Sequence, residues 1–291
     1  TSSPDANGTS GQAFSYQILA GNSPVAYGAT GLPAGLSVNT STGLISGTPT
    51  TPGDHNATIS AANAAGTTSM TLSLVVVEDI VSGLVAHWTF DENNGTIAHD
   101  SSGNDHNGTL QNGPTWTQGK IGEALSLDGS NDFVQVQNTN ALNIQSEITI
   151  SAWVFSNNFS SGHQEFVVKG ASNSRQYAFR AENSNGSLVF FIYSTVNQEY
   201  RTDSNVPLTN GQWSHVVGSY DDDKIRTYIN GVNSSTSVIG SIEIRQTAEM
   251  LALGRLGSSS AEYFNGKLDD VRIYNRALSA DEIQALYQLG N

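Results

Sequence analysis

Short apolar stretches separated by turn residues constrain this chain more than any other feature of its sequence. Stretches such as 14–19, 148–155 and 213–220 each have a Gly, Asp or Ser within three residues of both ends. Runs of this length are typical of β-strands, whereas an amphipathic helix needs apolar residues three and four apart over a longer stretch. The 29 glycines strengthen this reading, because glycine favours turns and weakens helix interiors. The sequence therefore predicts an all-β fold.

The first part of the chain predicts one small β-sandwich. Residues 1–12 are small and polar, and we expect them to be frayed. Strand-like alternation follows at 14–19, 44–47, 57–61 and 70–77, with clusters of turn residues between these stretches. Several short strands at such spacing favour a sandwich.

The stretch 31–50 reads GLPAGLSVNTSTGLISGTPT, and its residues have clear structural uses. Gly35 and Gly43 permit tight turns, while Pro33 and Pro49 fix the backbone angle φ. This stretch resembles the signature of Ig-like modules, related to cadherin domains, in bacterial exported proteins. The resemblance implies an Ig-like spacer domain over residues 1–78, followed by a linker over 79–83.

The second part, residues 84–291, contains further strand-like runs and every tryptophan of the chain. We expect strands at 85–90, 133–136, 148–155, 166–169, 177–180, 188–194, 213–220, 225–229, 250–255 and 268–274. Near the end, Ser279 and Glu282 are spaced as in a capping box, and Ile283, Leu286 and Tyr287 follow at helical spacing. One short C-terminal helix is therefore predicted.

Six motifs of this second part occur in an order that resembles the laminin-G-like, concanavalin A-like jelly roll. They are AHWTFDE from 86, DSSGNDHNGTL from 100, ITISAWV from 148, GQWSHVV from 211, RTYING from 226 and GKLDDVRIYNRALS from 266. The family includes carbohydrate-binding modules of secreted polysaccharide-degrading proteins, adhesion domains and enzyme appendages. The resemblance therefore implies a jelly-roll domain over 84–291, but fold alone does not give function.

Charge and composition exclude several classes of partner. The net charge is −14, and no Lys or Arg precedes Lys120. Nucleic acid is an unsuitable partner, because phosphate binding requires clustered basic side chains. No apolar run approaches the roughly 20 residues that a membrane span needs, and the absence of cysteine excludes a disulfide scaffold. We expect a secreted or cell-surface protein that is part of a larger multidomain chain.

No catalytic residue is predicted from motifs. The sequence contains neither Gly-x-Ser-x-Gly nor His-Glu-x-x-His. It also lacks the alternating Glu-x-Asp-x-x-Glu strand that places two carboxylates on one face in jelly-roll glycosidases. Carboxylates gathered only by the fold, such as Glu165, Glu182 and Glu199, leave a glycoside hydrolase or polysaccharide lyase as an alternative. The run Asp221–Asp223 is interpreted as a solvated hairpin tip.

A glycine-bent loop near residue 100 predicts a structural calcium ion. Asp100, Asn104 and Asn107 supply hard oxygen donors on one short loop, and Ca²⁺ prefers six to eight such oxygens. The family resemblance implies that Asp269, near the C-terminal strand, completes the site. An Asx-rich turn without an ion is the alternative interpretation.

Sugar binding needs aromatic faces together with polar groups that reach hydroxyls. Strand alternation assigns Leu188, Phe190 and Ile192 to the core, which turns Phe191 and Tyr193 outward. Trp88 and Trp213 are assigned to the core because they lie in framework motifs. The predicted ligand-binding residues are Trp153, Lys169, Tyr177, Arg180, Phe191, Tyr193 and Arg201.

The sequence therefore favours a non-catalytic carbohydrate-binding protein with a polysaccharide as its partner. Arginine suits the carboxylate or sulfate groups of an acidic polysaccharide, so an acidic glycan is somewhat favoured over a neutral one. Alternatively, the basic residues only neutralise Glu165, Glu182 and Glu199. A surface adhesion or structural segment with protein partners is the second functional class.

Overall fold

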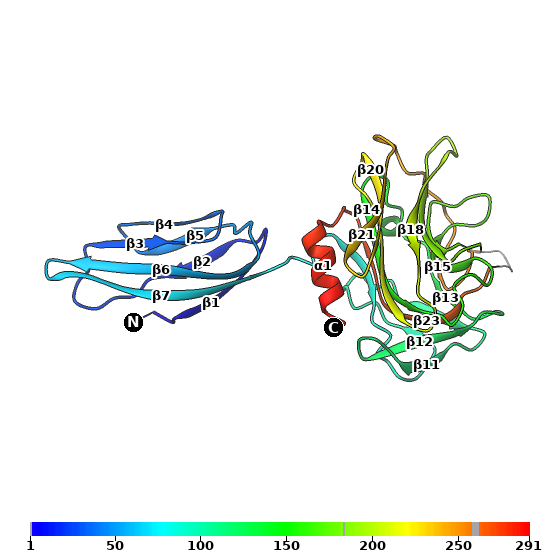
Figure 1. The fold of residues 1–291 in the computed structure, drawn as a ribbon, viewed down its shortest axis with the longest axis horizontal. Helices are drawn as coiled ribbons and strands as arrows, with labels where there is room; N and C mark the ends of the chain where they lie inside the picture. Colours follow the sequence, from blue (N-terminus) through cyan, green and yellow to red (C-terminus); the bar gives the residue numbers. More distant parts are fainter. Residues whose placement is uncertain (1, 183, 258–261) are drawn as a thin grey trace. The chain divides into compact units, whose positions relative to one another are not determined.

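The computed structural model describes residues 2–182, 184–257 and 262–291. The chain divides into two compact units, residues 1–82 and 83–291, and each has its own elements in Figure 1. The division falls within the 79–83 stretch that separates the two predicted domains. In the described residues no helix has the length and apolar character that a membrane crossing requires.

The first unit is a sandwich of two small sheets. One sheet has the order β1 (Asp5–Thr9), β7 (Gly66–Val77), β6 (Gly53–Asn63) and β3 (Ala26–Thr30). The other has the order β2 (Phe14–Gln17), β5 (Leu44–Gly47) and β4 (Leu36–Val38). The expectation that residues 1–12 are frayed is wrong, because β1 pairs in parallel with β7. A local polar composition could not reveal that pairing.

Two glycines of the 31–50 stretch are required by a close approach of the backbone. Gly35 has φ +89°, and a Cβ atom there would lie 1.9 Å from the carbonyl oxygen of Thr48. At Gly47 a Cβ atom would lie 2.1 Å from the carbonyl oxygen of Gly35. These contacts fold β4 onto β5, and Ile45 of β5 is buried in the core with Leu72 of β7.

The second unit is a jelly roll of two large sheets, here named the β16 sheet and the β14 sheet. The β16 sheet has the order β18 (Glu199–Pro207), β17 (Ser187–Tyr193), β16 (Tyr177–Ala181), β15 (Gln164–Lys169), β22 (Leu251–Leu253), β13 (Phe133–Val136), β10 (Gly108–Gln111) and β9 (Ile97–Ala98). The β14 sheet has the order β11 (Thr115–Gln118), β12 (Glu123–Asp128), β23 (Asn265–Tyr274), β14 (Ile148–Phe155), β19 (Trp213–Tyr220), β20 (Lys224–Ile229) and β21 (Val232–Val238). β8 (Leu84–Trp88) pairs with β23, and a 3-10 turn spans Asn140–Leu142.

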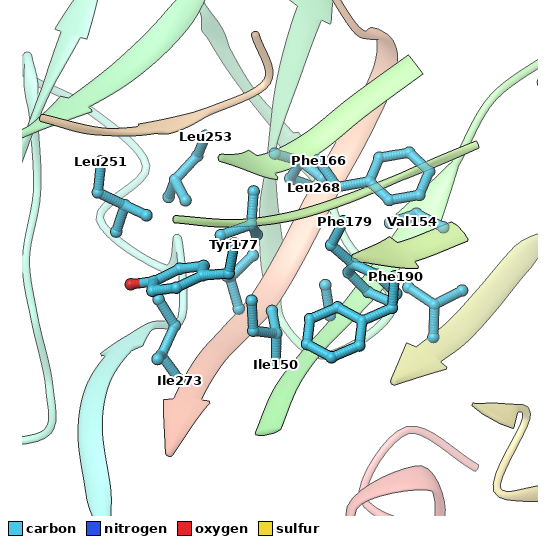
Figure 2. Close-up of a cluster of buried hydrophobic side chains, with 14 of the residues drawn as sticks. Ile150, Val154, Phe166, Tyr177, Phe179, Phe190, Leu251, Leu253, Leu268 and Ile273 are labelled. Carbon is cyan, nitrogen blue, oxygen red and sulfur yellow. The ribbon is translucent and has the colours of Figure 1, made fainter. Parts of the chain in front are cut away.

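The core of the second unit lies between the inner faces of these sheets. Alternate residues of each strand enter it, as expected for a pleated strand with one buried face. Figure 2 shows Ile150 and Val154 of β14 together with Phe179 and Phe190 of the opposite sheet. The remaining residues of each strand therefore form two outer faces, and these are the surfaces on which a ligand site has to be sought.

The predicted C-terminal helix is confirmed as α1 (Ala280–Gln288). The Ser279 side chain accepts from the Glu282 backbone N–H, and the Glu282 side chain accepts from the Ser279 backbone N–H, which forms the expected capping box. α1 lies against the outer face of the β14 sheet, where the Tyr287 ring stacks on Trp153 with ring centroids 5.8 Å apart. The all-β fold class with one short helix is also confirmed.

Candidate functional site

The outer face of β15–β18 gathers four of the predicted ligand-binding residues, and we call it the arginine face. Register places Arg180 of β16 opposite Val189, and places Phe191 of β17 opposite Arg201 of β18. Tyr193 follows two residues after Phe191 and therefore shares its side of the sheet. The predicted outward orientation of Phe191 and Tyr193 is confirmed.

The arginines of this face are held by carboxylates. Arg180 reaches Glu165 with Nη1 to Oε1 at 3.2 Å and Glu182 with Nη2 to Oε2 at 3.4 Å. Arg201 also contacts Glu182, at 3.4 Å, and donates from Nε to Asp203 Oδ1 at 2.8 Å. The alternative interpretation, in which basic residues neutralise nearby carboxylates, therefore describes both arginines.

Aromatic side chains of the arginine face are largely covered by these charges. The Phe191 side chain is only 1% exposed, because the guanidinium groups of Arg175 and Arg180 lie 5.4 and 5.2 Å from its ring centroid. Tyr193 is half-buried and its hydroxyl donates to Glu199. Of the four predicted residues gathered here, Tyr193 and Arg201 are therefore the ones that present usable surface to a ligand.

Glu165 is the buried centre of the charge cluster. Burial raises the pKa of this carboxyl to about 7, although the nearby arginines act in the opposite direction. Its Oε2 atom has no hydrogen-bond partner among the described residues. Glu262 lies next to it, and although burial alone would raise the pKa of Glu262, the hydrogen bond from His163 and the nearby Arg175 guanidinium lower it. A substrate could not reach Glu165, whose side chain has no exposed surface.

His163 and Glu262 belong to this cluster and were not predicted from the sequence. The His163 ring contacts Glu182 through Nε2 at 2.7 Å and Glu262 through Nδ1 at 3.0 Å. Glu262 precedes β23 in the chain and reaches the arginine face only through the fold. The position of His163 just before β15 was the only available signal, and it does not distinguish a cluster member from a loop histidine.

Lys169 and Tyr177 do not lie on a ligand-accessible surface, and their assignment as sugar contacts is wrong. Tyr177 lies in the core, as Figure 2 shows, and its hydroxyl donates to the Leu142 carbonyl. Lys169 is buried as well, and its ammonium donates to the Asn138 side chain and to two backbone carbonyls. Burial lowers the pKa of Lys169 to about 8.

The two tryptophans Trp153 and Trp213 exchange the roles that the sequence predicted for them. Trp153 faces outward from β14, as expected, but α1 covers it and leaves it 1% exposed. Trp213, assigned to the core, is half-buried on the same outer face and packs against Phe155 with ring centroids 5.7 Å apart. Trp88 is buried, and its indole N–H donates to the His106 carbonyl.

The three predicted calcium ligands on the 100–107 loop already form hydrogen bonds within the protein. Both carboxylate oxygens of Asp100 accept backbone N–H groups, from His87 and Ser102 on Oδ1 and from His106 on Oδ2. The Asn107 side-chain oxygen accepts from the Asp100 N–H. The Asn104 amide donates to the Val85 carbonyl. The side-chain oxygens of Asp100 and Asn107 therefore already accept backbone N–H groups, as in an Asx-rich turn.

Asp269 lies on the outer face of β23, and its carboxylate contacts a different turn. Its Oδ2 accepts from the backbone N–H groups of Lys120 and Ile121 at 2.7 and 2.8 Å. Its Oδ1 is buried and has no partner within the described residues. Burial, together with the nearby Asp270 and Asp91 carboxylates, raises the pKa of Asp269 to about 7, although the hydrogen bonds from Ile121 and Lys120 act in the opposite direction. An unpartnered carboxylate oxygen near Asp91 suits a cation better than the 100–107 loop does, but no group of three metal-binding side chains occurs in the described chain.

Chemically, the arginine face offers many hydrogen bonds but no excess positive charge. Three guanidinium groups face the carboxylates of Glu165, Glu182, Asp203 and Glu262. Donors and acceptors that alternate in this way suit the hydroxyl groups of a sugar, each of which can donate and accept. Such a face has no surplus charge with which to attract a polyanion.

Comparison with family models matches both parts of the chain. Residues 128–284 match the model described as the Concanavalin A-like lectin/glucanases superfamily. Residues 1–77 match the model described as Putative Ig domain. Comparison with the curated proteins finds no match.

Several solved structures are similar to this chain. Domain 4 of AbnA, a GH43 extracellular arabinanase from Geobacillus stearothermophilus solved with arabinotriose, is 24% identical, with a TM-score of 0.57, 70% of this chain covered and 98% of that one. The binding domain of Paraclostridial Mosquitocidal Protein 1 is 19% identical, with a TM-score of 0.57, 71% of this chain covered and 52% of that one. The ligand binding domain of botulinum neurotoxin serotype D, solved with N-acetylneuraminic acid, is 16% identical, with a TM-score of 0.53, 72% of this chain covered and 51% of that one. This chain thus spans about half of each toxin domain, and at these identities the likeness concerns the fold alone.

Proposed function

Because this chain belongs to the concanavalin A-like lectin and glucanase superfamily, we propose that it is a non-catalytic protein that binds a polysaccharide through its jelly-roll domain. The observation that carries the proposal is the fold of residues 83–291. Of the similar structures named above, the two toxin domains are described as binding domains, and domain 4 of the arabinanase was solved with arabinotriose. The setting that we propose is outside the cell, where polysaccharides are met.

The proposed contacts on the arginine face are Tyr193 and Arg201. Tyr193 offers part of an aromatic ring, and the Arg201 side chain is 38% exposed. Arg180 contributes through its contacts with Glu165 and Glu182 and through its cover of Phe191, so it positions this face more than it touches the ligand.

A neutral glycan fits this face better than an acidic one. The expectation of an acidic glycan depended on a cluster of basic residues, but Lys169 is buried elsewhere and Arg180 and Arg201 are paired with carboxylates. Added salt distinguishes the two possibilities, because screening weakens binding to a polyanion and leaves a neutral ligand nearly unaffected. We expect retention that does not change with salt.

Affinity electrophoresis tests the function directly. The wild-type protein would be run through native gels that contain linear arabinan, arabinoxylan, β-glucan, alginate or polygalacturonate, and retardation by at least one of them is expected. The variants Arg201→Ala and Tyr193→Ala should weaken the retardation, whereas Arg226→Ala removes an arginine whose ion pair with Asp221 lies on the other sheet and serves as the matched control. Retention by no polysaccharide, together with tight capture of a defined protein partner, would favour the adhesion alternative.

Calcium remains part of the proposal as a structural ion of the second domain. The structural support is limited to Asp269, whose Oδ1 lacks a partner, and to Asp91, which raises the pKa of Asp269. Asp100, Asn104 and Asn107 would have to exchange internal hydrogen bonds for the ion. Enzyme activity stays the least supported alternative, and release of reducing sugar across the same polysaccharides tests it.

A further inference from the structure

A row of five residues crosses the outer face of the β14 sheet, on the opposite side of the jelly roll from the arginine face. Strand register places its members next to one another in the order Trp213, Phe155, Lys267, Ser126 and Thr115. Neighbouring strands lie about 4.8 Å apart, so five strands give the row a length of roughly 19 Å. We call these five residues the aromatic row.

The aromatic row is partly exposed, whereas the neighbouring row on the same face of the sheet is buried. Two residues away along the strands, Trp153 and His215 are sealed by α1, with Tyr287 stacked on the Trp153 ring. Trp213, Phe155 and Lys267 instead remain half-buried. The helix therefore covers the row of Trp153 and His215 and leaves the aromatic row partly exposed.

The only cation of the row is not neutralised by a carboxylate. Lys267 Nζ lies 5.6 Å from the Phe155 ring centroid and 3.4 Å from Thr117 Oγ1. It forms no ion pair with any described residue, whereas each arginine of the arginine face does. An ammonium has three N–H donors and Thr117 accepts from one of them, so the other two can donate to an outside ligand without the loss of an ion pair.

The side chains of the aromatic row fit a polysaccharide better than a protein partner. Two adjacent aromatic rings, a free ammonium and two hydroxyl side chains suit a chain whose residues have apolar C–H faces and peripheral hydroxyls, which describes a polysaccharide. A stable protein interface buries about 800 Å² on each partner around an apolar centre. Two half-buried aromatic residues bordered by Ser and Thr do not provide such a centre.

We propose that the aromatic row is a second glycan-binding surface, on which one polysaccharide chain lies across the strands with a sugar ring on Trp213 and Phe155. This inference rests on the proposed function and adds a site on the face opposite Tyr193 and Arg201. This chain would then hold glycan on both sides of one domain.

Affinity electrophoresis of residues 1–291 in the polysaccharide gels named above tests the inference. Trp213→Ala should weaken retention at least about tenfold, as truncation of a central aromatic contact does. Lys267→Ala should weaken it about threefold or more through the lost hydrogen bond. Val238→Ala, at a 69% exposed position of the same sheet, is the matched control and should bind like the wild type.

The outcomes separate the two proposals. If the wild type is retained but Trp213→Ala and Lys267→Ala both bind as it does, the aromatic row is not a glycan surface and the proposed function stands. If no polysaccharide retains the wild type, both proposals fall. If Trp213→Ala melts at a lower temperature than the wild type, the binding of Lys267→Ala tests the proposal instead. The Lys267 side chain makes only a weak hydroxyl contact and a ring contact, so its loss should not unfold the domain.

Discussion

The two outer faces of the jelly roll use similar residue types in opposite ways. On the arginine face, guanidinium groups are paired with carboxylates and cover an aromatic ring, so Phe191 is buried beneath charge. On the β14 sheet, a helix covers one tryptophan and leaves a second one half-exposed beside an unpaired lysine. Both faces have aromatic residues that point away from the core, but they are covered by different elements.

This difference shows that facing outward and being available to a ligand are separate properties. Arginine and carboxylate side chains can seal a sheet face as a helix does, provided that each buried charge has a partner. The charge cluster around Glu165 is then structural, and the ligand-accessible part of each face is what its cover leaves open. The predictions below test this contrast, from the largest expected effect to the smallest.

The largest expected effect comes from removal of an arginine from the arginine face. At about pH 8 or above, where Glu165 is ionised, Arg180→Ala leaves its carboxylate without its closest cation, and loss of one partner of a buried pair costs about 3–5 kcal/mol. Urea unfolding should show this loss, together with early melting. Lys267→Ala, on the open face, should change the unfolding free energy by less than about 0.5 kcal/mol. Equal small effects at the two sites would remove the distinction between the faces.

A pH series tests whether Glu165 is buried as the structure indicates. Burial raises its folded pKa from 4.5 to about 7, so the native state binds the proton more tightly than the unfolded state. The stabilisation is complete below pH 4.5 and is lost as the pH rises through 7. Relative to Glu165→Gln, the wild type should therefore lose up to about 3 kcal/mol of unfolding free energy between about pH 5 and pH 8.

The matched control for this series is Val238→Ala, a change at an exposed position that removes no titratable group, which should leave the pH profile unchanged. Asp269→Asn in the presence of EDTA should reproduce the Glu165→Gln result, because burial also raises the pKa of Asp269 to about 7. A flat difference between wild type and Glu165→Gln from about pH 5 to 8 would contradict the burial of this carboxyl.

Removal of calcium tests whether an ion binds near Asp269, on the part of the outer face of the β14 sheet that is covered. An ion that binds only the native state adds RT ln(1 + [L]/Kd), or about 2.7 kcal/mol at 100 times Kd. We expect the melting midpoint of the second domain to fall when EDTA replaces calcium, and Asp269→Asn to abolish this response. A midpoint that EDTA does not change would remove calcium from the proposal.

The smallest expected effect concerns the first domain. It contains no Lys, Arg or Trp, so we expect it to act as a spacer that adds nothing to glycan affinity. A shortened chain that begins at Gly83 keeps the whole jelly-roll core, and it should bind each retained polysaccharide as the full chain does. A loss beyond tenfold, about 1.4 kcal/mol, would show that the two faces are not sufficient for binding.

Much of the fold was readable from the sequence because it is encoded locally. The capping box at Ser279 and Glu282 predicted where α1 begins, and alternation in 188–193 assigned the inner and outer residues of β17. Strands with weak local patterns were missed, including β1, β18 and β21. These are edge strands, and their pairing with distant segments, rather than an apolar pattern, makes them strands.

The candidate sites depended on contacts that no local pattern reveals. Alternation correctly turned Trp153 outward, but the tertiary structure placed Tyr287, more than a hundred residues later in the chain, on top of it. The same holds for Glu262, which reaches Glu165 from beyond β22. The sequence by itself determined the central strands, the helix and the side of the sheet on which most residues of a well-patterned strand lie, because these follow from spacing within a segment. Only the tertiary structure decided which outward residues stay exposed, because the elements that cover them come from distant parts of the chain.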